Sequence, residues 1–388
     1  MWANRIIFPF APAFPSADSA SAQHPPLDGS LRATVVLVTR RRLRCNARLA
    51  AIAVALAACG TSAAAVHKTA ATDSTTTPAP TVAAAAPTSM PPPPTSPLTG
   101  LPTDPATIPR PVLVVKIDNI ADAHPQSGIN QADVVYEELV ENSSTRLMAL
   151  FQSTDAGPIG PVRSARPTDV LLFTPLKRPL FAWSGANTWV REMIGNANIV
   201  DVGNTPAVDQ YYREGSRAAP HNLYIQGYTS MLESHQEDAG APPPLFAYRS
   251  PADPLGANAR PIGSVNIVYG SYGGNAPVDY VWDAPSGGWF RSQAGVPHVD
   301  TDGVQVAPPN VVIQFVDYVP NAGIPDGQLL GQGVAWVLTA GNIVEGTWSK
   351  ADAETPTQFT DAAGAPIKLT PGRTWVSLAP PDSATITG

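Results

Sequence analysis

A short apolar run that ends in a cysteine divides this chain and limits which residues can form its folded part. Residues 49–60 read LAAIAVALAACG, and the nine residues before Leu49 include five arginines, Arg40, Arg41, Arg42, Arg44 and Arg48. The run is too short to cross a bilayer as a helix, which takes about 20 apolar residues. A basic stretch followed by an apolar core and small residues is typical of a secretion signal. We therefore expect the folded part to begin after this run.

The end of the run resembles a bacterial lipobox, through Leu56-Ala57-Ala58-Cys59. The chain would then be cut before Cys59, whose thiol would carry lipid and hold the protein on the extracytoplasmic face of the cell membrane. The alternative is a buried cysteine in an ordinary apolar helix. Residues 1 to about 39, upstream of the basic stretch, show no periodic apolar pattern, and valine can mark an alternative GTG start, so we expect translation to start near Val38. Residues 1–58 would then be an over-called start plus a lipoprotein signal peptide.

The charge balance restricts the partners of the protein. The chain of 388 residues has a formal net charge of −7. Residues 1–58 hold seven basic and two acidic residues, so the remainder holds 17 basic and 29 acidic residues, a net charge of −12. An acidic chain without a basic stripe matches neither nucleic acid nor anionic lipid. We expect no nucleic-acid partner, and membrane attachment only through the lipid on Cys59.

The cysteine count excludes several kinds of site. Cys45 and Cys59 are the only cysteines. Cys45 would leave with the signal peptide, and lipid would block the thiol of Cys59. The mature chain would then have no disulfide, no cysteine metal site and no thiol catalysis.

The remaining chain is expected to comprise a tether and two domains. Residues 59–96 are rich in Ala, Thr, Ser and Pro, a composition that buries too little apolar surface to fold and predicts a disordered tether. Residues 97–238 combine strand patterns, such as Val112–Asp118, with helical patterns, such as Thr188–Ile194 and Tyr224–His235, and predict a mixed α/β domain. The proline-rich residues 239–260 predict a linker. Short strand patterns separated by turn residues predict a mostly β domain over residues 261–382. The fold class expected for the whole chain is therefore α+β.

Several motifs resemble those of the YerB-like lipoprotein family. In the first predicted domain they are PQSGINQAD at 125–133, GPVRSAR at 160–166 and RAAPHNLY at 217–224. In the second they are EGTWSK at 345–350 and LTPGRTW at 369–375. The resemblance extends from Pro97 to about Leu378 and implies a two-domain plan, but it brings no activity. Phe181–Gly185 departs from the His-containing, Gly-rich stretch expected in relatives, which argues against a mechanism based on a histidine there.

The candidate ligand-binding residues are Arg163, Arg166, Glu137, His221 and Asn222. Two guanidinium groups three residues apart after a Gly-Pro turn suit a phosphate or carboxylate. Together with the expected location, this predicts binding of an anionic ligand such as a cell-wall glycan or peptide. The alternative is that the arginines only pair with Glu137, Glu138 or Asp133, and that His221 and Asn222 only lock a loop.

An enzyme and a structural module remain alternatives. His221 could act as a general base with Glu137 or Glu138 as acid, in a hydrolase or transferase of envelope polymers. However, the serines lack a Gly-x-Ser-x-Gly elbow, and the histidines lack zinc-site spacing. We expect no metal and no cofactor, and the tryptophans of residues 282–375 are expected to form core rather than to stack on sugars. The oligomeric state is left open by the sequence.

Overall fold

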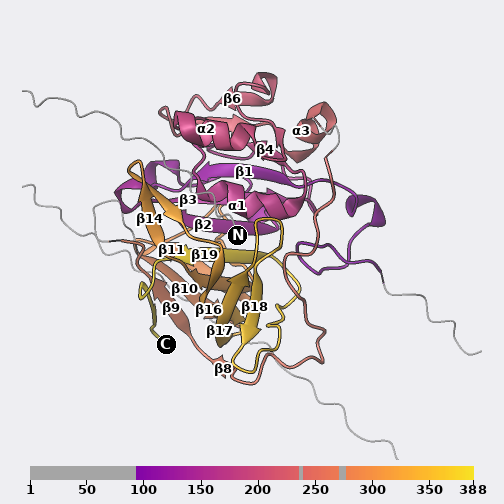
Figure 1. Cartoon of the computed structure of the whole chain (residues 1–388), viewed down its shortest axis with the longest axis vertical. Helices are drawn as coiled ribbons and strands as arrows, with labels where there is room; N and C mark the ends of the chain where they lie inside the picture. Colours follow the sequence, from indigo (N-terminus) through magenta and orange to yellow (C-terminus); the bar gives the residue numbers. More distant parts are fainter. Residues whose placement is uncertain (1–92, 236–238, 271–276) are drawn as a thin grey trace, which may run out of the picture. The chain divides into compact units, whose positions relative to one another are not determined.

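The computed structural model describes residues 93–235, 239–270 and 277–388. Cys59, the expected signal peptide and nearly all of the expected tether lie outside the described residues. The described chain is mostly β, with three short α-helices (Figure 1). These helices are α1 (Thr168–Phe173), α2 (Thr188–Gly195) and α3 (Tyr228–His235). The short 3-10 helices are η1 (Pro105–Thr107), η2 (Ala121–Ala123), η3 (Ile129–Gln131), η4 (Glu141–Ser143), η5 (Thr174–Leu176) and η6 (Val208–Gln210).

The apolar run at residues 112–118 forms a strand that is buried on both faces. All six residues of this strand, β1, are buried, and it pairs antiparallel with β3 and parallel with β4. Such a strand needs cover on both faces. Phe173 of α1 and Val190 of α2 pack in the cluster on one face, and Tyr228 and Met231 of α3 pack in the cluster on the other. The strands of the N-terminal half are β1 (Leu113–Asp118), β2 (Val134–Leu139), β3 (Thr145–Phe151), β4 (Leu180–Ala182), β5 (Val200–Asp201), β6 (Tyr211–Arg213) and β7 (Leu223–Ile225).

One sheet runs through both halves of the described chain. Its strand order is β18-β17-β16-β13-β19-β2-β3-β1-β4-β5, and β8 also pairs with β17. The buried strand β19 lies between β13 and β2 and runs parallel to both, so it joins the two halves (Figure 1). The C-terminal strands of this sheet are β8 (Arg260–Pro261), β13 (Asn310–Phe315), β16 (Gly331–Thr339), β17 (Asn342–Lys350), β18 (Gln358–Asp361) and β19 (Thr374–Ala379).

A second, five-stranded sheet packs on the main sheet. Its order is β12-β11-β10-β9-β20. Tyr280 and Trp289 of this sheet share one buried cluster with Ile313 and Trp375 of the main sheet. The remaining strands are β9 (Ser264–Ile267), β10 (Val278–Asp283), β11 (Gly288–Gln293), β12 (Val296–Pro297), β14 (Tyr318–Asn321), β15 (Ile324–Gly327) and β20 (Ala384–Ile386). Of the five tryptophans expected in the core, Trp289, Trp348 and Trp375 are buried, and Trp282 and Trp336 are partly buried against it.

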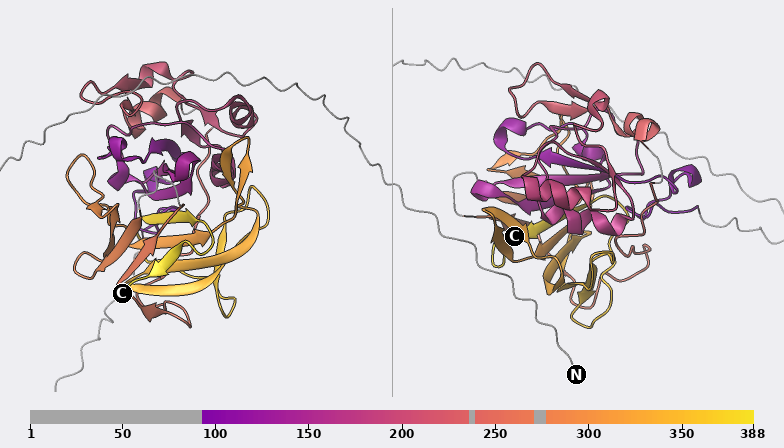
Figure 2. Two further views of the ribbon diagram at one scale, coloured as in Figure 1. Left: turned by 90° about the vertical axis from the view of Figure 1, so that its left-hand side faces the viewer. Right: turned by 45° about the horizontal axis from the view of Figure 1, so that its top comes forward.

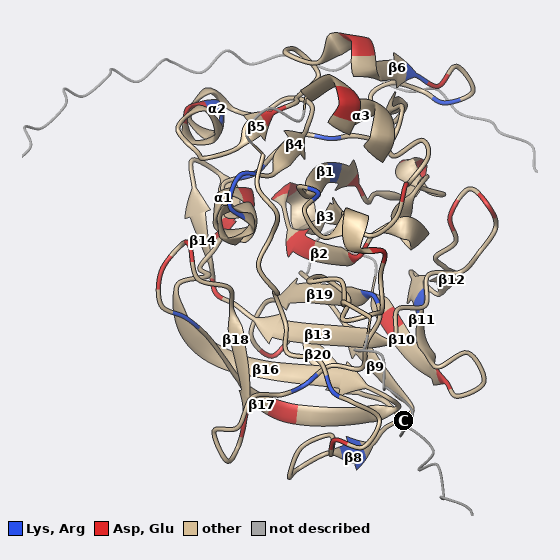
Figure 3. Ribbon diagram, turned by 90° about the vertical axis from the view of Figure 1, so that its right-hand side faces the viewer, with Lys and Arg blue, Asp and Glu red and all other residues tan. Residues whose placement is uncertain are grey.

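The two halves differ in the charge of their central strands. Strands β13, β16 and β19 carry no charged residue, whereas β1 carries one basic and one acidic residue and β2 and α1 carry acidic residues (Figure 3). The segment with α2 and α3 lies at one end of the molecule, away from the yellow C-terminal strands (Figure 2).

Strands of residues 97–238 and of residues 261–382 form the same sheet. The expected division into two domains at these bounds therefore stays a prediction. Across the described residues, no helix is long and apolar enough to cross a membrane.

Candidate functional site

Three arginines line one recess at the end of β1. The recess has a volume of about 520 Å³. The arginines are Arg146 at the start of β3 and Arg163 and Arg166 in the segment before α1. The other lining residues are Asp118, Ile120, Val140, Glu141, Asn142, Ser144 and Thr145. We call this hollow the arginine recess.

Backbone pairing brings the arginines together. Arg146 lies opposite Asp118 in the antiparallel register of β1 and β3. The segment that follows β3 returns along β1, where the backbone N–H of Arg163 donates to the carbonyl of Lys116 at 2.8 Å. The turn of η4 forms part of the lining, with Asn142 in the left-handed region at φ 59°. Arg146 and Arg163, which are 17 positions apart in the sequence, therefore lie close together where β1 ends and β3 begins.

Asp118 is the centre of the polar contacts in the recess. Its Oδ2 accepts hydrogen bonds from Arg163 Nε at 2.8 Å and His221 Nδ1 at 2.7 Å. Its Oδ1 accepts from the backbone N–H of Asn119 at 3.0 Å. Because the carboxylate is an acceptor, His221 carries its proton on Nδ1, which leaves Nε2 without a proton when the ring is neutral.

Arg166 has a carboxylate partner of its own. Its Nε and Nη2 donate to Glu141 Oε2 at 2.9 and 2.7 Å, and its Nη1 donates to the carbonyl of Ala165. Partial burial raises the pKa of Glu141, but hydrogen bonds from its own backbone and from Arg166 outweigh this and lower the pKa below its usual value. Arg163 thus pairs with Asp118, and Arg166 pairs with Glu141. Neither arginine pairs with Glu137, Glu138 or Asp133, the partners that the sequence suggested.

Arg146 has no carboxylate partner in the described part of the chain. Its Nη1 donates to the carbonyl of Ser164 at 2.9 Å. Burial and then the charge of Arg166 lower the pKa of Arg146 to about 10, so the side chain stays positive at neutral pH. A half-buried guanidinium beside two others favours an anion at this position.

His221 and Asn222 lie in the turn between β6 and β7, outside the lining of the arginine recess. The His221 side chain is 14% exposed and contacts Asp118. Asn222 points elsewhere: its Oδ1 accepts from Arg213 Nη1 at 2.7 Å, and its Nδ2 donates to the carbonyls of Glu214 and Arg217. Asn222 therefore holds the turn that presents His221.

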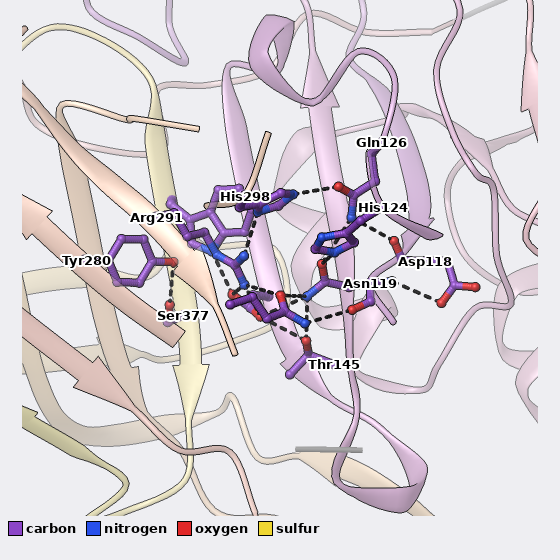
Figure 4. Close-up of polar contacts among 12 residues, drawn as sticks. Asp118, Asn119, His124, Gln126, Thr145, Tyr280, Arg291, His298 and Ser377 are labelled. Carbon is purple, nitrogen blue, oxygen red and sulfur yellow. Dashed lines mark hydrogen bonds and ion pairs between the residues drawn. The ribbon is translucent and has the colours of Figure 1, made fainter. Parts of the chain in front are cut away.

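Glu137 does not line the arginine recess. It is fully buried in an ion pair with Arg291 of β11, with Oε1 and Nη2 2.8 Å apart (Figure 4 shows the surrounding contacts). Trp375 Nε1 also donates to its Oε2 at 3.0 Å. Thr145, which lines the recess, donates to Glu137 Oε1 at 2.9 Å and so connects the two sites.

Two stacked histidines extend this buried network. His298 Nδ1 accepts from Arg291 Nη1 and its Nε2 donates to Gln126 Oε1, both at 2.6 Å (Figure 4). The ring of His124 stacks on His298 with centroids 4.5 Å apart. Burial and then the charge of Arg291 lower the pKa of both histidines, to about 4 for His124.

Glu138 lies in a third, separate group. It is buried with Lys116, which also binds Asp169 at 2.6 Å. Burial raises the pKa of Glu138 to about 7, although Lys116 opposes the shift. Among the described residues, His221 pairs with Asp118, and Glu137 and Glu138 pair with Arg291 and Lys116, so the acid–base pair that the sequence suggested is not brought together. Sequence reasoning also missed Arg146, Glu141, Arg291 and His298, because no local motif marks them.

The sequence matches both parts of one described family. Residues 98–241 match "Protein of unknown function (DUF3048) N-terminal domain", and residues 265–376 match the corresponding C-terminal domain. The chain belongs to this family. This DUF3048 protein is similar to the protein named "Putative lipoprotein YerB" of Bacillus subtilis (strain 168), with 28% identity over 309 residues, 75% of this chain and 88% of that protein.

A solved structure shows the same fold. The crystal structure of YerB from Bacillus subtilis superimposes with a TM-score of 0.67 at 26% identity, covering 76% of this chain and 99% of that chain. The resemblance to YerB-like lipoproteins is therefore confirmed. The DUF3048 protein is a lipoprotein-like protein whose fold extends over both family segments.

Proposed function

We propose that the protein is a lipoprotein, anchored on the extracytoplasmic face of the cell membrane by lipid on Cys59, that binds an anionic cell-wall ligand in the arginine recess. The basic stretch, the apolar run and Cys59 occur in the order of a lipoprotein signal. A relative named as a lipoprotein supports the same location. In this proposal residues 97–238 act as a mixed α/β binding domain, and the β domain of residues 261–382 supports it.

One observation carries the binding proposal: Arg146, Arg163 and Arg166 line one recess, and Arg146 lacks a carboxylate partner among the described residues. The lining contains three positive and two negative side chains, so a bound anion would offset the remaining charge. A carboxylate or phosphate held by guanidinium groups gains hydrogen bonds as well as charge attraction. Such a ligand would include acidic wall glycans and peptides.

The other candidate residues take supporting roles in this proposal. His221 holds Asp118, which in turn orients Arg163. Asn222 fixes the turn that carries His221. Glu137 lies outside the recess and accepts a hydrogen bond from Thr145, which keeps the Thr145 side chain in place in the lining.

The test compares binding of wall fragments by two double variants. Arg146→Gln/Arg163→Gln removes two charges from the recess, and we expect at least a tenfold loss of affinity in a pull-down with isolated cell walls. The matched control Arg260→Gln/Lys368→Gln removes two exposed charges that pair with Glu345 and Asp253 in the C-terminal half. Equal binding by the two variants, both folded by circular dichroism, would contradict the proposal. Mass spectrometry of the N-terminal peptide must also find lipid on Cys59.

A further inference from the structure

We infer that the arginine recess selects a phosphodiester rather than a carboxylate. The inference rests on the proposed function, because it names the class of anion that the recess would bind. It follows from the hydrogen-bond donors that remain available, from the charge of the lining and from two apolar side chains beside the arginines.

The available donors come from two guanidinium groups. Arg163 uses only Nε in a hydrogen bond, to Asp118, so both of its Nη groups have no acceptor in the described chain. Arg146 uses only Nη1, to the carbonyl of Ser164, so its Nε and Nη2 are likewise available within the described segments. Arg166, by contrast, uses all three nitrogens on Glu141 and Ala165. Two arginines therefore present donors to a ligand, while the third mainly adds charge.

The number of donors favours a tetrahedral anion. A carboxylate has two oxygens with four lone-pair directions in one plane, and one arginine fork takes the two that face the same way. The second guanidinium would then lack an equivalent partner. The two non-ester oxygens of a phosphodiester accept hydrogen bonds from directions outside a single plane, so each of them can accept from both arginines. Asn142 and Ser144 in the same lining add neutral groups that can bond the substituents.

The charge and the apolar contacts favour a diester. Three arginines against Asp118 and Glu141 leave one positive charge in the lining, which matches the single negative charge of a phosphodiester. Ile120 and Val140 line the same recess and can contact the carbon chain of an ester substituent. A free phosphate or a monoester carries more charge and offers these side chains less to contact.

The experiment measures affinities of the full-length protein by isothermal titration calorimetry at constant ionic strength. The probes are glycerophosphoglycerol as the diester, glycerol 3-phosphate as the monoester and gluconate as a carboxylate of similar size. We expect the diester to bind at least tenfold more tightly than gluconate. Vesicles of phosphatidylglycerol, against neutral phosphatidylcholine vesicles, distinguish a lipid headgroup from a soluble diester as the source of the same chemistry.

Variants identify the contact. Arg146→Lys keeps the charge and removes the fork, so we expect diester affinity to fall at least fivefold while gluconate affinity changes less than twofold. Arg260→Gln is the control, in an exposed ion pair of the C-terminal half. Gluconate binding as tightly as the diester would overturn the phosphodiester assignment and leave the proposed anion site standing. Failure of every anion to bind the folded protein would overturn both.

Discussion

At the scale of single residues, the N-terminal half concentrates charge in places where it must be paired. Glu137 and Arg291 are both fully buried, as are Lys116 and Asp169. A buried ion pair is costly to form, and breaking it by removing one partner costs more, because the other charge stays in a medium of low dielectric constant. The recess differs, because Arg146 and Arg163 are only partly buried and line a hollow of about 520 Å³.

The first prediction concerns this buried pair. Glu137→Gln leaves Arg291 buried without its counter-charge, so we expect the free energy of unfolding to fall by about 3–5 kcal/mol. Urea denaturation followed by tryptophan fluorescence measures the change. The control Glu345→Gln breaks an exposed pair with Arg260 and should cost less than about 1 kcal/mol. Similar losses for the two variants would show that the buried contact does not stabilise the fold.

At the scale of elements, strand β17 depends on close packing against β18. Gly346 of β17 lies opposite Asp361 of β18 in the antiparallel register. A Cβ at Gly346 would lie 2.2 Å from the carbonyl oxygen of Thr360 and 2.9 Å from Ile367 Cδ1. Only glycine lets the two strands approach this closely, so the residue fixes the position of the edge strand.

Gly346→Ala should therefore displace β18 and lower the free energy of unfolding by about 1–3 kcal/mol, as overpacking does. Gly195→Ala is the matched control, at the end of α2, where an added Cβ meets nothing within 4 Å. The control should be neutral or stabilise by up to about 1 kcal/mol, because alanine restricts the unfolded chain. Thermal unfolding of both variants tests the contrast, and a stable Gly346→Ala protein would refute it.

The elements were more predictable from the sequence than the site. The apolar pattern at 112–118 predicts β1, and the pattern at 188–194 predicts α2 closely. The helix expected from Tyr224 begins only at Tyr228, because Leu223–Ile225 pairs with β6 as a strand. Arg146 could not be singled out, since one polar position in a strand has no motif around it. The His221–Asp118 contact joins residues 103 positions apart, which only the tertiary fold brings together.

At the scale of the whole molecule, the position of β19 makes the two halves depend on each other. The parallel pairing of β19 with β2 and β13 could not be read from local patterns, because strand order depends on long-range contacts. Beside this junction, Arg291 and His298 of the C-terminal half contact Glu137 and Gln126 of the N-terminal half. The network between the halves is therefore polar and contains two histidines held neutral.

The protonation of these histidines should make the junction sensitive to acid. The pKa of His124 is lowered to about 4 and that of His298 also lies below its usual range, whereas both are near 6.5 in the unfolded chain. Between these values the unfolded state binds more protons than the folded state. The stability that the neutral histidines contribute is thus complete above about pH 6.5 and is lost as the pH falls, by up to about 1.4 kcal/mol per pH unit for each histidine.

The variant His124→Gln/His298→Gln tests this acid sensitivity. At position 298, glutamine can accept from Arg291 and donate to Gln126 as histidine does, but it does not titrate. We expect the variant to lose less free energy of unfolding than the wild type between pH 6.5 and pH 4.5 in urea titrations. Carboxylates that titrate in this range are common to both proteins. The difference between the two slopes of unfolding free energy against pH therefore reports the two histidines alone. Parallel pH profiles would show that their protonation is not what weakens the junction between the halves.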